Sequence, residues 1–244
     1  MIFSKEVYEL NKIQKDRFIV YTHQGLGDHI ICNGLINYIT KKNAHIYMPV
    51  KSRDFKSISY LYSQNKNITL FEIQGDKEAD DVKAYSKINK LQTLKVGFKK
   101  NKPPFNLSFY KQLQIPYEIS FENFFIPRDY QKENDLFNYL KNYHKVVDDY
   151  QLVHNQSSYG KANLKINPNL NSIYVDKNTD IFKNIFFYVK LIEEAKEIHC
   201  LDSSFLHLVE RINTSANLYF HNLKSNEDKA AKIYLVKEWN WLNY

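Results

Sequence analysis

The sequence predicts an α/β protein with two Rossmann-like domains that face one another across a cleft. Strand and helix patterns alternate along the 244 residues, which is typical of parallel sheets covered by helices. The alternation restarts at Tyr150, after a stretch rich in proline and aromatic residues. We therefore expect one domain over residues 1–147 and a second over residues 148–244, with ligands bound beyond the carboxyl ends of the strands.

The elements of the first domain follow from short apolar runs and from apolar residues at helical spacing. The run RFIVYTH is the clearest buried strand, and the helix after it repeats isoleucine and leucine on one side. Expected strands are Arg17–His23, Ala44–Val50, Ile68–Ile73 and Leu94–Gly97, and expected helices are His29–Lys41 and Asp54–Gln64. Residues Lys99–Pro127 are expected to be an irregular connection packed by its aromatic rings.

The second domain shows the same alternation after an amphipathic helix at Tyr130–Tyr143. Expected strands are Gln151–Asn155, Ser172–Asp176, Glu197–Leu201 and Ala216–Phe220, and expected helices are Ile181–Ala195, Ser204–Ile212 and a C-terminal helix at Asn226–Val236. We expect the aromatic tail Trp239–Tyr244 to pack back on the first half, and contact with the edge of a membrane is the alternative.

Composition narrows the class of protein. Mean hydropathy is −0.53 and the sequence lacks an apolar run long enough for a membrane span. It begins without a signal-peptide pattern and has two cysteines, so we expect a cytoplasmic protein. The net charge of +7 fits an anionic ligand such as a nucleotide diphosphate. We expect no nucleic-acid partner, because the sequence has no basic helix, zinc spacing or RNA-binding aromatic signature.

A glycine turn joins the first strand to its helix. Gly25 and Gly27 can take backbone conformations that let a ligand touch the main chain. A dinucleotide fingerprint needs a glycine where Ile30 stands, and a P-loop needs a lysine that is absent, so both are excluded. Asp28 has two interpretations, a helix N-cap or a general base whose carboxylate faces the cleft.

Two polar stretches mark the second domain. Asp202, Ser203 and Ser204 lie between a strand and a helix, and His207 follows one turn into that helix. Hydroxyl residues at such a position can bind anionic oxygens, whereas the alternative is a helix cap above a buried histidine. Upstream, another strand ends in a loop of small polar residues with a cation, which can close on a diphosphate: His154, Ser157, Ser158, Gly160 and Lys161.

These motifs resemble those of the ADP-heptose:lipopolysaccharide heptosyltransferases, a family of GT-B glycosyltransferases. The stretch Gly25–Asp28 matches that family's G-x-G-D turn before an apolar helix. The same family has a strand that ends in histidine and is followed by a loop of small residues and a lysine. His154, Ser157, Ser158 and Lys161 match this pattern loosely. Asp202–Leu208, with the sequence DSSFLHL, matches a D-[ST]-[GS]-x-x-H-[LI] motif and is the most specific of the three.

The resemblance implies a GT-B-like fold and a role for each matched residue. Asp28 would deprotonate the acceptor hydroxyl, and the acceptor-side loop would be His23, Gln24, Gly25 and Gly27. The donor nucleotide-diphosphate sugar would be held by His154, Ser157, Ser158, Lys161, Asp202, Ser203, Ser204 and His207. It implies an inverting transfer to a glycan or glycolipid, without a bound metal or another cofactor. Peripheral membrane contact is the alternative that the aromatic tail leaves open.

Several points stay open at the level of sequence. Ser204 stands where the resembled family usually has glycine, and the basic residues on the diphosphate side are few. The transferred sugar is therefore unresolved between a hexose, a heptose and a fucose. The alternatives to a transferase are a non-catalytic nucleotide- or sugar-binding module of the same fold and a nucleotide-sugar epimerase.

Overall fold

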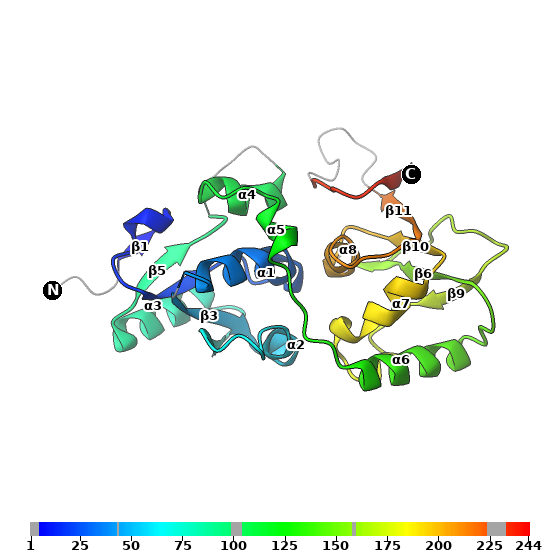
Figure 1. Ribbon diagram of the computed structural model, residues 1–244, viewed down its shortest axis with the longest axis horizontal. Coiled ribbons are helices and arrows are strands. Elements are labelled where there is room, and N and C mark those ends of the chain that lie inside the picture. The colour runs from blue at the N-terminus through cyan, green and yellow to red at the C-terminus, as the bar shows by residue number, and fades with distance from the viewer. Residues whose placement is uncertain (1–4, 43, 99–103, 158–159, 224–232) are drawn as a thin grey trace. The chain divides into compact units, whose positions relative to one another are not determined.

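The structure is a computed structural model that describes residues 5–42, 44–98, 104–157, 160–223 and 233–244. The chain forms two compact units, Met1–Pro127 and Arg128–Tyr244. Within the described residues, each unit contains one five-stranded sheet in which all strands are parallel (Figure 1). Both units therefore have the Rossmann-like character that the sequence predicts.

The first sheet has the strand order β1-β5-β2-β3-β4. Its strands are β1 (Glu6–Val7), β2 (Arg17–Tyr21), β3 (His45–Lys51), β4 (Ile68–Ile73) and β5 (Gln92–Lys95). The chain runs outward from β2 through β3 to β4 and then returns to the other side of β2 as β5. The order of strands thus reverses between β2 and β5, and the carboxyl end of such a switch point is where ligands bind in this architecture.

Helices cover the first sheet (Figure 1). They are α1 (Leu26–Thr40), α2 (Phe55–Leu61), α3 (Glu78–Asn89), α4 (Phe105–Gln112) and α5 (Ile119–Glu122), with 3-10 turns η1 (Leu10–Lys12) and η2 (Ser52–Asp54). Helix α1 is the central one, and its residues Ile30, Ile31, Cys32, Leu35 and Ile36 are fully buried. The Tyr110 hydroxyl of α4 donates to the Ile31 carbonyl of α1 at 2.8 Å. The expected irregular connection after residue 99 is therefore partly helical and packs on α1.

Gly34 allows α1 to approach α5 closely. A Cβ on Gly34 would lie 2.5 Å from the backbone oxygen of Ile119 and 2.8 Å from that of Ser120. We predict that Gly34→Ala lowers the free energy of unfolding by about 1–3 kcal/mol, because two backbones would have to move apart. Urea unfolding tests this, with Gly75→Ala as control, since a Cβ there meets no described atom within 4 Å. Equal losses in the two variants would refute the close-packing argument.

The second sheet has the strand order β12-β11-β10-β6-β9. Its strands are β6 (Tyr150–His154), β9 (Asn171–Tyr174), β10 (Glu197–Cys200), β11 (Asn217–Asn222) and β12 (Trp239–Asn243), and β7 (Gln156–Ser157) and β8 (Gly160–Lys161) form a separate hairpin. The chain moves from β6 to β9 and then crosses to the other side of β6 as β10. The switch point of this sheet therefore lies between β6 and β10.

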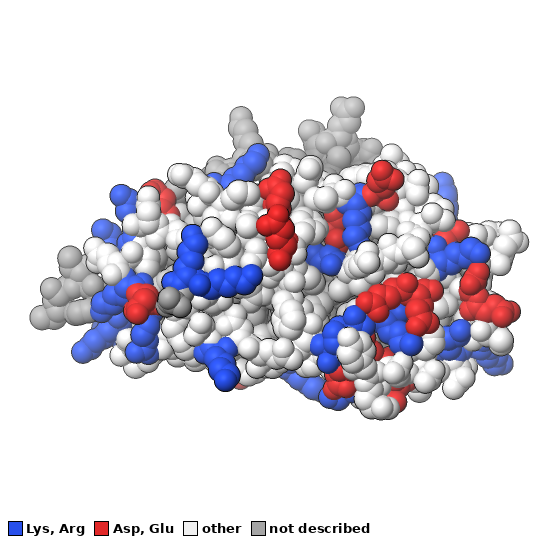
Figure 2. All heavy atoms as spheres, viewed as in Figure 1, with Lys and Arg blue, Asp and Glu red and all other residues white. Residues whose placement is uncertain are grey.

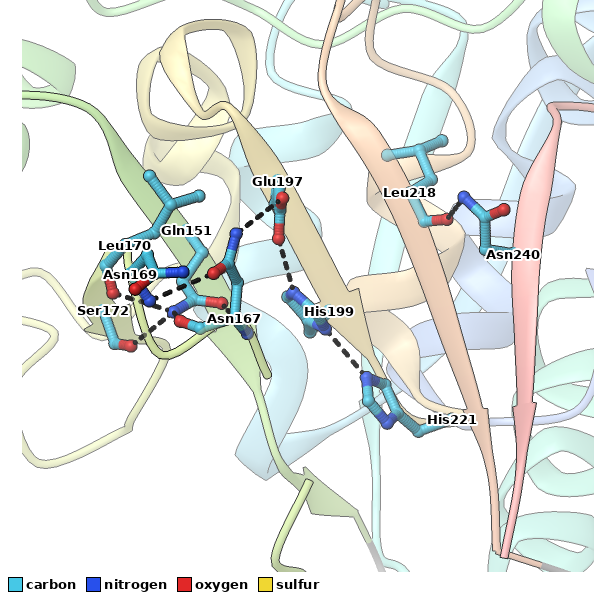
Figure 3. A network of polar contacts seen from close by, with 10 residues as sticks. All are labelled: Gln151, Asn167, Asn169, Leu170, Ser172, Glu197, His199, Leu218, His221 and Asn240. Carbon is cyan, nitrogen blue, oxygen red and sulfur yellow. Dashed lines mark hydrogen bonds and ion pairs between the residues drawn. The ribbon is translucent and has the colours of Figure 1, made fainter. Parts of the chain in front are cut away.

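The two faces of the second sheet differ in polarity. Helix α6 (Tyr130–Tyr143), η3 (Ile185–Tyr188) and α7 (Val189–Glu194) pack on one another. Tyr188 of η3 meets Phe205 of α8 (Ser204–Val209), with ring centroids 5.8 Å apart. The Tyr150 hydroxyl donates to the Leu191 carbonyl of α7. The opposite face carries a polar network in which Asn167 bonds Glu197, Glu197 contacts His199, and His199 contacts His221 (Figure 3). Alternation along each strand separates these two sets of side chains.

The aromatic tail forms the fifth strand of the second sheet. Strand β12 pairs in parallel with β11, so the expectation that the tail packs on the first half is wrong. Buried Glu210 holds this strand, because its Oε2 accepts from the Trp239 indole nitrogen at 2.6 Å and its Oε1 from the Lys237 backbone nitrogen at 3.1 Å. Of the expected helix Asn226–Val236, residues 226–232 lie outside the described residues, and residues 233–236 are not helical.

The division between the units falls earlier than residue 147. Helix α6 packs on η3 and α7, and Arg128 bonds Glu133 of α6 and Glu193 of α7. Residues 128–147 therefore group with the second unit. On the face drawn in Figure 2, basic and acidic side chains are interspersed. Among the described residues, none of the helices is long and apolar enough to cross a membrane.

Candidate active site

The turn after β2 places its polar groups at the first switch point. The buried Gln24 side chain donates to the Thr22 carbonyl at 2.8 Å. Gly25 is the N-cap of α1 with φ −86° and ψ 150°, an extended conformation open to any residue. The sequence suggested that glycine was needed here for an unusual backbone conformation. The structure gives a different reason, because a Cβ on Gly25 would lie 2.7 Å from Oδ2 of Asp28.

Asp28 lies inside α1, because the helix begins at Leu26 rather than at His29. It is therefore not the N-cap. Its Oδ2 instead accepts a hydrogen bond from the Gly25 backbone nitrogen at 3.1 Å, which is one half of a capping box. The carboxylate thus satisfies one of the otherwise unpaired amides at the start of the helix.

Burial raises the pKa of Asp28 above that of an ordinary carboxyl. The nearby His23 charge, the Gly25 amide and the Lys51 ammonium all oppose this effect. A half-buried carboxylate with a raised pKa accepts a proton more readily than an exposed one, which suits a general base.

Two residues that the sequence reasoning missed lie near Asp28. Lys51 ends β3 at the same edge of the sheet and pairs with Glu78. His29 is fully buried, and neither ring nitrogen has a hydrogen-bond partner among the described residues. Burial, with a smaller contribution from Lys51, lowers the pKa of His29 to about 4. Lys51 could have been predicted as a site residue from its position at the carboxyl end of a strand. His29 could not, because its sequence position is that of an ordinary helix residue.

The second switch point brings together His154 and Ser203. Strands β6 and β10 are paired with His154 opposite Cys200. The chain after β10 then places Ser203 Oγ 3.1 Å from Nδ1 of His154. The His154 ring stacks on Phe205 with centroids 5.3 Å apart, and burial lowers its pKa to about 4. The two predicted loops therefore meet, as expected for the carboxyl ends of neighbouring parallel strands.

The remaining residues of the DSSFLHL motif differ in burial, because some lie at the start of helix α8 and His207 lies on its buried side. Ser203 is its N-cap and accepts from the Leu206 backbone nitrogen at 3.4 Å, while Asp202 and Ser204 are half-buried beside it. The side chain of His207 is buried, with 3% exposure, and burial lowers its pKa to about 3. The structure thus matches the alternative given above, in which a serine caps the helix and the histidine is buried.

The hairpin after β6 carries the remaining donor-side candidates. Lys161 is exposed in β8, and its strand pairs with β7, which contains Ser157. Ser158 lies outside the described residues. Gly160 has φ +112°, a conformation that favours glycine. Among the described residues, no group of three or more histidine, cysteine, aspartate or glutamate side chains could hold a metal ion.

Comparisons with known proteins bear on the fold. The crystal structure of the glycosyl transferase family 9 from Veillonella parvula DSM 2008 is similar to 96% of this chain and 87% of that one, with a TM-score of 0.60 and 10% identity. The chain has a GT-B-like fold. The iron-containing dodecameric glycosyltransferase TibC from enterotoxigenic E. coli H10407 matches 90% of this chain and 62% of that one, with a TM-score of 0.49 and 12% identity. No protein-family model matches the chain, and no curated protein sequence does.

The candidate residues divide between the two units. The first unit holds His23, Gln24, Gly25 and Asp28 at its switch point. The second unit holds His154 and Ser203 at its own. Among the other donor-side candidates, Lys161 is exposed in the hairpin and His207 is buried, so these two cannot play equivalent roles.

Proposed function

We propose that this protein is a glycosyltransferase that moves a sugar from a nucleotide-diphosphate sugar to a glycan hydroxyl, with inversion and without a metal. The observation that carries the proposal is that both sheets have candidate site residues at their switch points: Asp28 in the first, and His154 with Ser203 in the second. Ligands bind at such points in open α/β sheets. The GT-B-like fold supports the same assignment.

Asp28 acts as the general base in this mechanism. The acceptor hydroxyl is a weak nucleophile, and its attack on the anomeric carbon is assisted when a carboxylate takes its proton. The raised pKa of Asp28 makes it a stronger base once ionised. Direct attack breaks the bond from the sugar to the diphosphate in one displacement, so the configuration at the anomeric carbon inverts.

The second unit binds the donor and stabilises the leaving group. Charge develops on the diphosphate as the glycosidic bond breaks, and fixed donors aimed at that oxygen lower the barrier. In this proposal the hydroxyls of Ser203 and Ser204 and the ammonium of Lys161 are donors to the diphosphate. Ser203 Oγ lies 3.1 Å from Nδ1 of His154, and the proposal requires the neutral imidazole to carry its proton on Nδ1 and donate it to Oγ, so that the Ser203 O–H stays free for the diphosphate. Buried His207 supports α8 from within and does not touch the donor.

A non-catalytic sugar- or nucleotide-binding module is the second candidate. The observation that favours it is the bond from the Gly25 amide to Asp28, since a capping role accounts for the carboxylate without chemistry. The two candidates predict the same ligand binding and differ only in turnover, so a binding measurement locates the donor site under either one.

Nucleotide binding is expected to raise the melting temperature and to depend on Lys161. We predict that at least one nucleoside-diphosphate sugar stabilises the protein in a thermal-shift panel, by about 2.7 kcal/mol at a hundred times its Kd. Lys161→Ala should reduce this gain, because it removes the exposed cation of the donor hairpin. His207→Ala should lower the melting temperature of the free protein and leave the gain unchanged, because His207 is buried.

Lys196→Ala is the matched control for charge. Lys196 is exposed and pairs with Asp149 at the amino end of β10, at the opposite edge of the same sheet. Surface pairs of this kind contribute little to stability. If no nucleoside-diphosphate sugar raises the melting temperature, or if Lys196→Ala reduces the gain as much as Lys161→Ala does, the donor site is wrongly assigned.

A further inference from the structure

A group of aromatic side chains lies at the switch point of the first sheet and has no role in the mechanism so far. Phe98 follows β5 and Phe105 begins α4, and each is 36% exposed. His23, in the turn after β2, is exposed as well. Large apolar side chains that stay in contact with water at the mouth of a ligand site are typical of binding surfaces.

The three rings form one cluster through buried Phe109. The His23 ring meets Phe98 edge to face with centroids 5.0 Å apart, and it meets Phe109 in the same way at 5.5 Å. Phe105 in turn packs edge to face on Phe109 at 6.4 Å. Phe105 thus packs directly on this interior ring, and Phe98 is linked to it through His23, while part of each phenylalanine remains exposed.

The backbone before Phe98 is fixed by its neighbours. Gly97 has φ +90°, and a Cβ there would lie 2.3 Å from Cε1 of Phe109. The Gly97 amide also donates to the buried Gln112 side chain at 2.8 Å. The chain is therefore held in the conformation that turns Phe98 toward the cluster.

The exposed ring of Phe98 is also held from the sheet side. Tyr21 at the end of β2 packs against it with centroids 4.8 Å apart. The Lys95 ammonium lies 4.9 Å from the centre of the ring and pairs with Glu6 at 3.3 Å. A ring with this support loses little freedom when a ligand covers it, which favours binding.

The cluster adjoins the proposed base. His23 lies in the turn after β2 and Asp28 in the first turn of the helix that follows, and the interaction with His23 opposes the effect of burial on the pKa of Asp28. The β5 end that carries Phe98 neighbours β2, because the Val96 amide donates to the Tyr21 carbonyl at 2.9 Å. A ligand on the rings would thus lie beside the carboxylate.

We propose that Phe98, Phe105 and His23 form a stacking platform for the sugar ring of the acceptor. This inference rests on the proposed function and names the binding surface for its acceptor. One face of a pyranose can present several C–H groups while its hydroxyls point outward around the rim. Stacking that face on aromatic rings removes apolar surface from water and leaves the rim hydroxyls solvated or free to meet Asp28.

Saturation-transfer NMR with methyl β-D-galactopyranoside tests the platform directly. Irradiation of aromatic protein protons should transfer saturation to the ring protons on one face of this sugar. The transfer should be lost in the Phe98→Ala/Phe105→Ala double variant. Phe98→Leu/Phe105→Leu keeps the apolar bulk without the ring faces, so it should lose the transfer while circular dichroism shows a folded protein. The matched control is Phe125→Ala, which removes a phenylalanine of the same unit that is 49% exposed.

The outcomes separate the platform from the proposed function. With an active donor and acceptor pair, the double leucine variant should raise the KM for the acceptor about tenfold and leave donor binding unchanged. If the double leucine variant has an unchanged KM for the acceptor and a normal rate of sugar transfer, the platform is refuted and the proposed transferase activity is retained. Saturation transfer that depends on Phe98 and Phe105, in a protein that transfers no sugar, supports the platform and removes the transferase. The platform is also refuted if Phe125→Ala loses as much saturation transfer as the double variants, or if the unaltered protein shows no saturation transfer to the sugar.

Discussion

Asp28→Asn is expected to reduce sugar transfer by about 10²- to 10⁴-fold while leaving nucleotide-sugar binding intact. An amide cannot take the proton of the acceptor hydroxyl, but its oxygen can still accept from the Gly25 amide, so the start of α1 keeps its capping bond. Initial rates measured with a coupled assay for the released nucleoside diphosphate provide the test. A thermal shift with the same donor checks that binding persists.

The raised pKa of Asp28 adds a signature in stability. When the pKa of a carboxyl is higher in the folded state than in the unfolded state, the folded protein binds more protons between the two values, and stability falls as pH rises through that window. Ionised Asp28 therefore lowers stability at neutral pH. Asp28→Asn should melt at the same or a higher temperature there, and this advantage should disappear below the ordinary carboxyl pKa of about 4.

Asp81→Asn is the control for these effects. Asp81 lies in the first turn of α3, and its Oδ2 accepts from the Gln74 backbone nitrogen at 2.7 Å, so it resembles Asp28 in local structure. Asp81 lies after β4, at the edge of the sheet and away from the switch point, so its replacement should leave the rate of sugar transfer unchanged. Full activity in Asp28→Asn would remove the assignment of the base, whatever its melting temperature.

Acid is expected to destabilise the protein steeply between about pH 6.5 and pH 4. Burial is the largest cause that lowers the histidine pKa in four places, to about 4 for His29, His154 and His221 and to about 3 for His207. In the unfolded chain these rings protonate near pH 6.5, so the unfolded state binds more protons throughout the window. The stability from the neutral rings is complete above pH 6.5 and is lost as pH falls toward the folded values.

The polar face of the second sheet contributes to this acid sensitivity. Nδ1 of His199 lies 2.9 Å from Nε2 of His221, and Nδ1 of His221 lies 2.6 Å from the Tyr244 hydroxyl (Figure 3 shows the two histidines). One imidazole nitrogen of the close pair must accept a hydrogen bond, so it must be unprotonated. Protonation of both rings would replace the bond by repulsion between two buried cations.

Urea unfolding at a series of pH values measures this loss. Each pKa unit by which folding lowers a histidine corresponds to about 1.4 kcal/mol, so four such groups outweigh most single substitutions. His29→Leu should reduce the slope of stability against pH by about one proton, since it removes one buried titrating ring. A free energy of unfolding that stays constant from about pH 7 to pH 5 would contradict the burial of these rings as neutral groups.

The parts of the fold that repeat a strong local pattern were predictable from sequence. The apolar runs that become β2, β4 and β10 are bounded by polar turns, and the helix at Tyr130–Tyr143 has the predicted bounds because its apolar residues recur on one side. The meeting of His154 with Ser203 was also predictable. Both follow strands that a right-handed crossover places side by side, so their loops share one edge of the sheet.

Other parts depend on tertiary contacts that a local pattern does not show. Helix α3 has only Val82 and Ser86 buried among charged residues, and prolines before α4 suggest an irregular chain. Strand β12 is short and has exposed tryptophan, so it resembles a tail until β11 pairs with it. The roles of single residues are harder still. Glycine at position 25 leaves room for the Asp28 carboxylate, and its own backbone conformation is open to any residue. The burial of His207 follows from how α8 packs.

The stereochemistry of transfer tests the central claim most directly. If Asp28 removes the proton of an acceptor hydroxyl that attacks the donor in one step, proton NMR at early times should show a product with the opposite anomeric configuration to the donor. The coupling constants at the anomeric position distinguish the two products, which do not interconvert because the anomeric carbon is held in a glycosidic bond. A product of inverted configuration that is absent with Asp28→Asn is the predicted result. Retention of configuration, or product formation that survives Asp28→Asn, would contradict it.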